Sequence, residues 1–176
     1  MGSMSARRVS LRQVGNRVIV TERPKQRQKA TEKSVQSRER FLDAAYYASR
    51  QILDPEANAL YKQGITEKKH SAYTVAMCDF IVAPTVESIS TIDYRGHVGD
   101  PIAIRAKDDF MVTRVKVQIL DSTGTLIEEG DAVTDESARM LWKYVATAAN
   151  ATPAGTTVRA IAFDKPGNVG SLEKVI

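Results

Sequence analysis

The stretch from Asp100 to Leu120 constrains the fold most strongly, because it holds two alternating apolar runs separated by a short acidic corner. The apolar members recur at every second position: Ile102, Ile104 and Ala106, then Val115, Val117 and Ile119. A period of two is typical of β-strands with one buried face. The stretch therefore predicts two neighbouring strands joined by the corner.

After Pro84, the same pattern of short strands and turns continues to the end of the sequence. Candidate strands bounded by Gly, Pro, Asp or Ser lie near 86–94, 101–107, 112–120, 125–131, 140–147, 156–164 and 170–175. Seven short strands in about 90 residues is the count of an antiparallel sandwich. Trp142 shares a strand face with Tyr144, and we expect it to anchor the core rather than to form a ligand platform.

Before Pro84 the apolar residues follow helical spacing. A long helix is predicted over 31–52, with a buried stripe made of Phe41, Ala45, Ala48 and Ile52. Asp54 and Pro55 predict the start of a second helix that ends at about Lys62. A third helix is expected to begin near Glu67 and to end at Ala83-Pro84.

The expected fold is therefore α+β, with an N-terminal three-helix segment and a seven-stranded antiparallel sandwich. We expect three parts: a basic, partly disordered arm over 1–30, a helical segment over 31–84 and the sandwich over 85–176. The sequence has no apolar run long enough to span a membrane and no hydrophobic segment behind the basic N-terminus. Together with a single cysteine, Cys78, this predicts a cytoplasmic protein without a disulfide.

A resemblance to a known family is carried by three segments: IRAKDDFMVTRVKVQI, WKYVATAAN and the closing VRAIAFDKPGN, which contains Ala162-Phe163-Asp164 and Gly167-Asn168. They resemble the immunoglobulin-like modules of many bacterial proteins over about residues 86–176. The whole chain is similar to small, uncharacterised bacterial proteins that join a helical N-terminal part to one such sandwich. The resemblance implies a spacer, adhesion unit or docking module, and no enzymatic activity.

Few residues of the sequence are spaced for catalysis or metal binding. The two histidines, His70 and His97, have no Cys or His partner nearby, so no zinc site is predicted. The adjacent acids Glu128-Glu129 and Asp135-Glu136 are expected to be solvated on strands. We therefore predict no enzyme, no catalytic residue and no cofactor.

Calcium is the one metal question that the sequence leaves open. Oxygen-bearing side chains fall at strand ends or turns, where a hard cation prefers clustered donors: Asp108, Asp109, Asp164 and Asn168. The same residue types also hydrogen-bond their own turns. The sequence alone does not decide between these two roles, and we predict no metal ligand.

Basic residues are concentrated at the N-terminus. Residues 1–40 contain eleven Lys or Arg and three Glu, a net charge of +8, while the rest of the chain has a net charge of −4 and the whole chain +4. The residues that can neutralise phosphates are Arg7, Arg8, Arg12, Arg17, Arg23, Lys25, Arg27, Lys29 and Lys33.

Two functions follow as expectations. The first is a non-enzymatic structural or protein-interaction protein that binds a partner or a second copy of itself, with no membrane contact. The alternative is a nucleic-acid-binding protein that uses the basic residues of 7–33.

Overall fold

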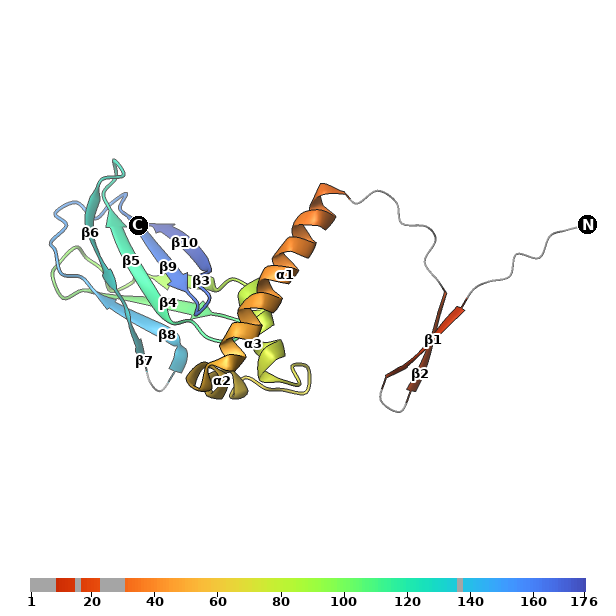
Figure 1. Cartoon of the computed structure of the whole chain (residues 1–176). Coiled ribbons are helices and arrows are strands. Elements are labelled where there is room, and N and C mark those ends of the chain that lie inside the picture. The colour runs from red at the N-terminus through yellow and green to blue at the C-terminus, as the bar shows by residue number, and fades with distance from the viewer. Residues whose placement is uncertain (1–8, 15–16, 23–30, 136–137) are drawn as a thin grey trace, which may run out of the picture. The chain divides into compact units, whose positions relative to one another are not determined.

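A computed structural model describes residues 9–14, 17–22, 31–135 and 138–176. The chain divides into two units, Met1–Glu39 and Arg40–Ile176. In the first unit, β1 (Val9–Val14) and β2 (Arg17–Glu22) form an antiparallel hairpin (Figure 1). The arm therefore contains two strands where it is described. The expected disorder concerns residues outside the described ranges.

Within the described ranges, three helices precede the sandwich: α1 (Glu32–Leu53), α2 (Pro55–Lys62) and α3 (Ala72–Ile81). The Asp54 carboxylate caps α2 as predicted, accepting hydrogen bonds from the backbone N–H groups of Glu56 and Ala57. The third helix begins five residues later than Glu67, because the Ser71 hydroxyl caps it by accepting the N–H of Thr74.

The predicted stripe of α1 is confirmed only in part: Ala48 is buried and Ile52 packs against the helical core, as predicted. Ala44 and Ala48 are fully buried, whereas Phe41 is 52% exposed. Two alanines let α1 approach its neighbours closely, and the adjacent Tyr47 ring packs on Phe80 of α3 with centroids 5.2 Å apart. The prediction of Phe41 as a core residue was wrong, because the α1 side chains in the helical core cluster are Tyr47, Ala48 and Ile52, which lie in later turns.

Two four-stranded antiparallel sheets follow (Figure 1). One has the order β10-β9-β5-β6 and the other the order β3-β4-β8-β7. The strands are β3 (Thr85–Ser90), β4 (Pro101–Lys107), β5 (Arg114–Leu120), β6 (Leu126–Asp131), β7 (Val133–Asp135), β8 (Ala138–Val145), β9 (Thr157–Phe163) and β10 (Val169–Val175).

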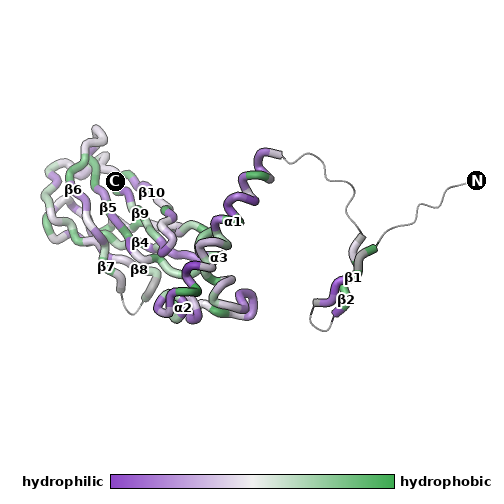
Figure 2. The backbone as a smooth tube through the Cα atoms, viewed as in Figure 1, coloured by the Kyte–Doolittle hydropathy of each residue, from purple (hydrophilic) through white to green (hydrophobic). Residues whose placement is uncertain are grey.

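The inner faces of the two sheets share one apolar core, so the domain is a β-sandwich. Trp142 and Tyr144 are buried in this core. So are the alternating apolar residues of β4 and β5: Ile102, Ile104, Ala106, Val115, Val117 and Ile119. Figure 2 shows hydrophobic and hydrophilic residues mixed along these strands, as expected of strands with one buried face. The predicted core anchor Trp142 is confirmed.

The α+β class is confirmed, and the sandwich has eight strands rather than the seven expected. The additional strand, β7, is three residues long and follows β6 after Ala132 alone. So short an element gives no periodic pattern in a sequence. Within the described residues, no helix combines the length and the apolar character needed to cross a membrane.

Strand β10 closes one side of the sandwich against the start of β3. A Cβ atom built on Gly170 would lie 1.8 Å from the carbonyl oxygen of Pro84. Farther along, the Lys174 ammonium donates to the carbonyl oxygen of Ile89 at 3.1 Å. These contacts join the two sheets where the helical segment ends.

Candidate functional site

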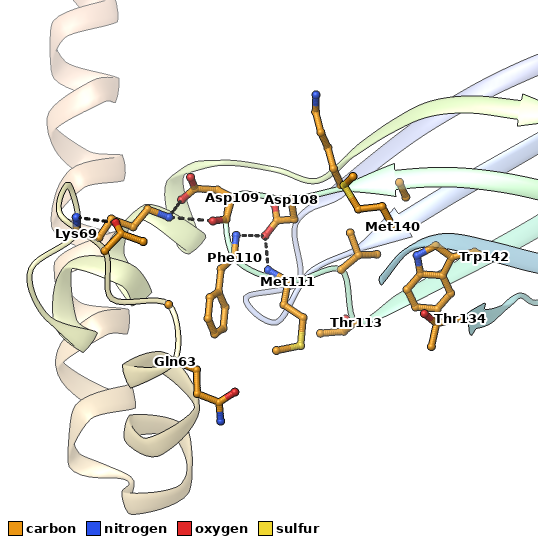
Figure 3. Close-up of a pocket in the computed structure, with 15 residues that line it drawn as sticks. Gln63, Lys69, Asp108, Asp109, Phe110, Met111, Thr113, Thr134, Met140 and Trp142 are labelled. Atoms are coloured by element: carbon orange, nitrogen blue, oxygen red, sulfur yellow. Dashed lines mark hydrogen bonds and ion pairs between the residues drawn. The ribbon is translucent and has the colours of Figure 1, made fainter. Parts of the chain in front are cut away.

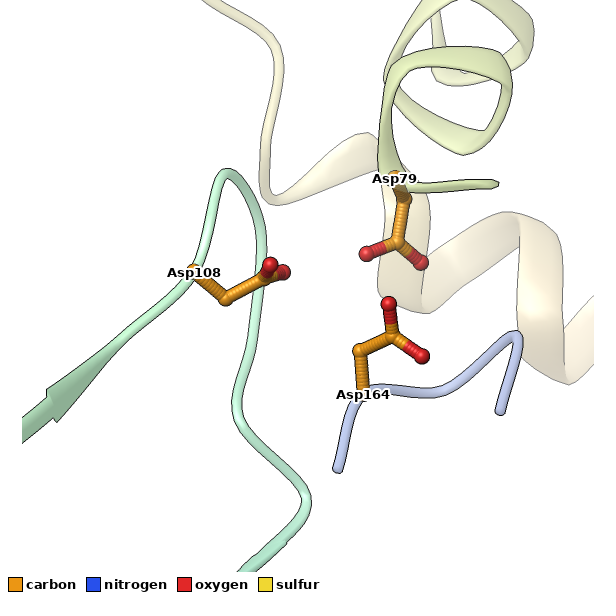
Figure 4. Close-up of side chains that lie close together, drawn as sticks. All are labelled: Asp79, Asp108 and Asp164. Atoms are coloured by element: carbon orange, nitrogen blue, oxygen red, sulfur yellow. The ribbon is translucent and has the colours of Figure 1, made fainter. Parts of the chain in front are cut away.

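Three aspartates from distant parts of the sequence meet where the helices contact the sandwich. Asp79 lies near the end of α3, Asp108 directly follows β4, and Asp164 directly follows β9. One oxygen from each carboxylate lies within 4.8 Å of the other two. Figure 4 shows the three carboxylates pointing toward a common space, and we call this group the aspartate cluster.

Asp79 is fully buried and is only partly hydrogen-bonded. Its Oδ2 accepts the hydroxyl of Tyr61 at 2.6 Å, and the Tyr61 hydroxyl lies 2.7 Å from that of Tyr47. Its Oδ1 is buried and has no hydrogen-bond partner. A buried oxygen without a donor is costly, so this atom requires an explanation.

Backbone N–H groups orient the other two carboxylates. Oδ2 of Asp108 accepts the N–H groups of Phe110 and Met111, both at 3.0 Å, while its buried Oδ1 has no partner. Oδ1 of Asp164 accepts the N–H groups of Gly167 and Asn168 at 2.8 and 2.6 Å. Both side chains are therefore fixed by their own turns before anything binds.

Asn168 ties the cluster to α3. Its side-chain amide donates to Oδ2 of Asp164 at 2.7 Å and to the carbonyl oxygens of Phe80 and Asp79 at 3.1 and 3.3 Å. One asparagine thus connects the loop after β9 with the end of the helix. It uses its donors on the protein itself.

The four oxygen-bearing residues considered for calcium, Asp108, Asp109, Asp164 and Asn168, do not all lie together. Asp108 and Asp164 lie in the cluster, and Asn168 lies at its edge. Asp109 points elsewhere and forms an ion pair with Lys69, with Oδ2 at 2.5 Å from Nζ. The sequence analysis missed Asp79, although it was signalled as the only acid in the apolar run of α3, where a buried charge requires a partner.

The cluster perturbs the titration of its central member. Burial raises the pKa of Asp79 to about 7; the hydrogen bond from Tyr61 opposes that rise, and the carboxylates of Asp108 and Asp164 add to it. Burial together with the hydrogen bond to Asp79 also raises the pKa of Tyr61 well above its usual range. Burial and the two neighbouring acids therefore disfavour the charged form of Asp79.

A groove of about 750 Å³ opens beside the cluster, between the loop after α2 and the sandwich. Figure 3 shows its apolar side chains, which include Phe110, Met111, Met140 and Trp142. Asp108 is also among the lining residues, so the groove reaches one member of the cluster. The indole Nε1 of Trp142 is buried without a hydrogen-bond partner.

A second exposed feature is an apolar stripe on α1. Leu42, Tyr46 and Leu53 are 66%, 69% and 76% exposed. At about 100° per residue these three side chains leave one side of the helix, while Ala44 and Ala48 leave the opposite side. We call Leu42, Tyr46 and Leu53 the α1 stripe. Among the described residues it has no apolar cover.

The predicted nucleic-acid-binding residues are only partly described. Arg12 and Arg17 are exposed on the β1–β2 hairpin, and Lys33 is exposed in the first turn of α1. The pairings Arg12↔Ile19 and Val14↔Arg17 place the two arginines on the same hairpin face. The remaining members of the set lie outside the described residues: Arg7, Arg8, Arg23, Lys25, Arg27 and Lys29.

The expectation that Glu128 and Glu129 are both solvated is wrong for Glu128. Glu128 is 8% exposed rather than solvated, because its strand partner Ile119 faces the core. Its Oε2 accepts four hydrogen bonds, from the Tyr144 hydroxyl, the N–H and hydroxyl of Thr147, and the N–H of Ala148. Its neighbour Glu129 instead pairs with Lys116 at 2.9 Å. Glu136 of the other predicted pair lies outside the described residues.

No family model matches the chain, and a search of curated proteins found no match. Among solved structures it is similar to CopC from Methylosinus trichosporium OB3b, with 17% identity and a TM-score of 0.36 over 51% of this chain and 87% of that one. An engineered protein gives 15% identity and a TM-score of 0.36 over 53% of this chain and 18% of its own. The β-glucuronidase of Bifidobacterium dentium complexed with coumarin-3-O-glucuronide gives 19% identity and a TM-score of 0.30 over 54% of this chain and 16% of its own. Likenesses of this size carry no argument about function, and the β-sandwich assignment rests on the two sheets and their shared core.

Proposed function

We propose that the chain is a non-enzymatic protein-interaction protein, in which a β-sandwich supports an apolar helix surface that docks onto another protein. The observation that carries this proposal is the α1 stripe. Scattered exposed apolar residues are ordinary, but a continuous line on the side of a helix away from its own core favours an interaction site.

The first occupant that we propose for the α1 stripe is a second copy of the chain. Leu42, Tyr46, Ser49 and Leu53 follow one another at spacings of four, three and four residues. This is the spacing at which two helices pack side by side along a shared apolar seam. The small Ser49 leaves room for a facing side chain between Tyr46 and Leu53.

The experiment is a measurement of molar mass in solution across a range of protein concentrations. We expect the full chain to dimerise and the double variant Leu42→Glu, Tyr46→Glu to remain monomeric with unchanged secondary structure. The matched control is Gln36→Glu, which adds a charge at an exposed position of the same helix away from the stripe. A full chain that is monomeric at every concentration would contradict self-association.

We also propose that the sandwich is an immunoglobulin-like module that serves as spacer or docking unit. Its strand order supports this: β3, β4, β8 and β7 take the places of strands A, B, E and D, and β9, β10 and β5 those of F, G and C. A cytoplasmic location is likewise proposed, supported by the one cysteine, Cys78, which is unpaired.

Nucleic-acid binding is the second candidate function. The observation that favours it is the shared hairpin face of Arg12 and Arg17 within a strongly basic segment. The test is binding of the full chain, and of a version lacking residues 1–30, to duplex and single-stranded DNA at low and near-physiological salt. Binding that persists at near-physiological salt and requires residues 1–30 supports this function, and loss of the signal on raising the salt counts against it.

A further inference from the structure

The aspartate cluster has the oxygen spacing of a cation site. Each of the three carboxylates brings one oxygen within 4.8 Å of the other two. Oxygens bound to the same Ca²⁺ at about 2.3–2.6 Å cannot lie more than about 5 Å apart. The cluster satisfies this limit without any movement of the backbone.

Two oxygens of the cluster have no donor. Oδ1 of Asp79 and Oδ1 of Asp108 are buried and lack any hydrogen-bond partner, and Asp79 is 0% exposed. The second oxygens of both side chains are occupied by Tyr61 and by backbone N–H groups. The unpartnered atoms are therefore not products of free rotation, because hydrogen bonds fix both carboxylates in place.

The protein supplies no positive charge to the cluster within its described residues. Of the nearby lysines, Lys69 pairs with Asp109 and Lys107 with Glu87, and Lys165, which follows Asp164, is exposed. No ion pair joins Asp79, Asp108 or Asp164 in the described part of the chain. Three acids gathered in a buried place without a cation are expected to repel one another.

We propose that Asp79, Asp108 and Asp164 bind one Ca²⁺ ion that fastens the end of α3 to the two adjacent loops of the sandwich. Each carboxylate comes from a different segment of the chain, so a single ion connects all three. Oδ1 of Asp108 has no donor, while Oδ2 of Asp164 accepts the Asn168 amide and retains a second lone pair for coordination. The role is structural and does not depend on the proposed docking function.

The donor set selects the kind of metal. All three side chains offer oxygen, and the cluster contains neither histidine nor cysteine. Oxygen donors suit hard cations, whereas zinc favours nitrogen and sulfur ligands. Ca²⁺ is favoured over Mg²⁺ because it tolerates irregular geometry and accepts several carboxylates, while Mg²⁺ requires a near-ideal octahedron and retains its waters. Asp108 is the member of the cluster that also lines the groove.

The experiment is titration of the full chain, freed of metal with EDTA and dialysed, with CaCl₂, MgCl₂ and ZnCl₂ in separate series. Thermal unfolding and calorimetry supply the readouts. We expect Ca²⁺ to raise the Tm by several degrees with a Kd below about 1 mM, and Mg²⁺ to act more weakly. Tb³⁺, a luminescent substitute for Ca²⁺, supplies a local readout, because Tyr61 lies next to Asp79 and can sensitise its emission on ultraviolet excitation.

The variant that tests the ligand assignment is Asp79→Asn, which retains an oxygen to accept the Tyr61 hydroxyl. We expect its Ca²⁺ affinity to fall roughly tenfold or more, since affinity depends on the number of ligand charges. The matched control is Asp109→Asn, one residue from the cluster and outside it, whose affinity should equal that of the parent chain. Asp108→Asn gives a second, independent test should Asp79→Asn not fold.

Three results would overturn the proposal. The first is a folded parent chain whose Tm and tyrosine-sensitised Tb³⁺ emission do not respond to the ions; a proton shared between Asp79 and Asp108 would then satisfy the unpartnered oxygens. The second is equal Ca²⁺ affinity in the parent and in folded Asp79→Asn and Asp108→Asn variants, which would assign binding to surface carboxylates. The third is an equal loss of affinity in Asp109→Asn.

Discussion

The two ends of strand β4 supply different numbers of hydrogen-bond donors to the carboxylates near them. At its beginning, Asp100 accepts the N–H groups of Arg95 and His97 through Oδ2, at 2.7 and 2.9 Å. Close to that end, buried Glu128 receives four hydrogen bonds on one oxygen. At the other end, Asp108 faces two further aspartates, and two oxygens of the cluster have no donor.

The difference lies in the donors that each acid collects, since Oε1 of Glu128 is buried without a hydrogen-bond partner as well. Glu128 receives four hydrogen bonds, whereas buried Asp79 receives a single one, from the Tyr61 hydroxyl. What sets the junction apart is that two acids with unpartnered buried oxygens lie together there, and such atoms require an explanation, for example a bound ion. Four substitutions can break or sharpen this comparison.

The largest effect is expected from Glu128→Ala. The change leaves the Tyr144 hydroxyl and the donors of Thr147 and Ala148 without their acceptor, which should lower the free energy of unfolding by about 2–3 kcal/mol. Urea unfolding followed by circular dichroism measures it. The control is Glu129→Ala, an exposed neighbour whose loss should cost less than about 1 kcal/mol. Equal costs for the two variants would contradict the structural role of Glu128.

Asp79→Asn should have the opposite sign when the protein is kept in EDTA. The asparagine oxygen can still accept the Tyr61 hydroxyl, and its amide can donate to the unpartnered Oδ1 of Asp108. Removal of one negative charge from the cluster should then raise the free energy of unfolding by about 1 kcal/mol near neutral pH. Glu128→Gln, measured in parallel, should be destabilised. A destabilised Asp79→Asn protein in EDTA would show that the carboxylate of Asp79, like that of Glu128, stabilises the fold.

Asn168→Ala tests how the junction is held together. The variant removes an amide that joins Asp164 to the carbonyl oxygens of α3, so we expect a loss of about 1 kcal/mol. Hydrogen exchange should show faster opening of the last turn of α3, while the exchange of β5 and β9 changes little. Lys165→Ala, an exposed position in the same loop, serves as the control. Unchanged exchange in α3 would show that other contacts hold the helix.

The smallest effect concerns Asp100 and pH. Hydrogen bonds from the N–H groups of His97 and Arg95 lower the pKa of Asp100 below its usual value. Its contribution to stability is therefore present above the unfolded pKa of about 4 and is lost as the pH falls through the lower folded pKa. The difference in unfolding free energy between the parent and Asp100→Asn should shrink as the pH is lowered from about 5 to 3. A difference that is constant over that range would contradict a special environment for Asp100.

Local patterns in the sequence predicted the elements, and long-range packing decided the rest. The alternation of Ile102 and Ile104 and the Asp54-Pro55 helix start depend on neighbours along the chain, and both predictions were confirmed. The placement of Asp79 beside Asp164 depends on how α3 meets the sandwich, which no local pattern encodes. Phe41 was assigned to the core because its spacing matches that of Ala48 and Ile52, and spacing alone cannot tell which turns of a helix meet the core.

The close approach at Gly170 has a consequence for how this protein can evolve. Its backbone conformation is not among the positive-φ glycines, so the constraint there is space: any side chain would collide with the Pro84 carbonyl. Gly99 is the reverse case, with a φ of 97° and nothing near the added Cβ. A saturation library selected for folding should therefore accept Asn at position 99 more readily than at 170, and should retain only glycine at 170. The position where the last strand meets the entry to the sandwich is thus expected to change more slowly than the turn that precedes β4.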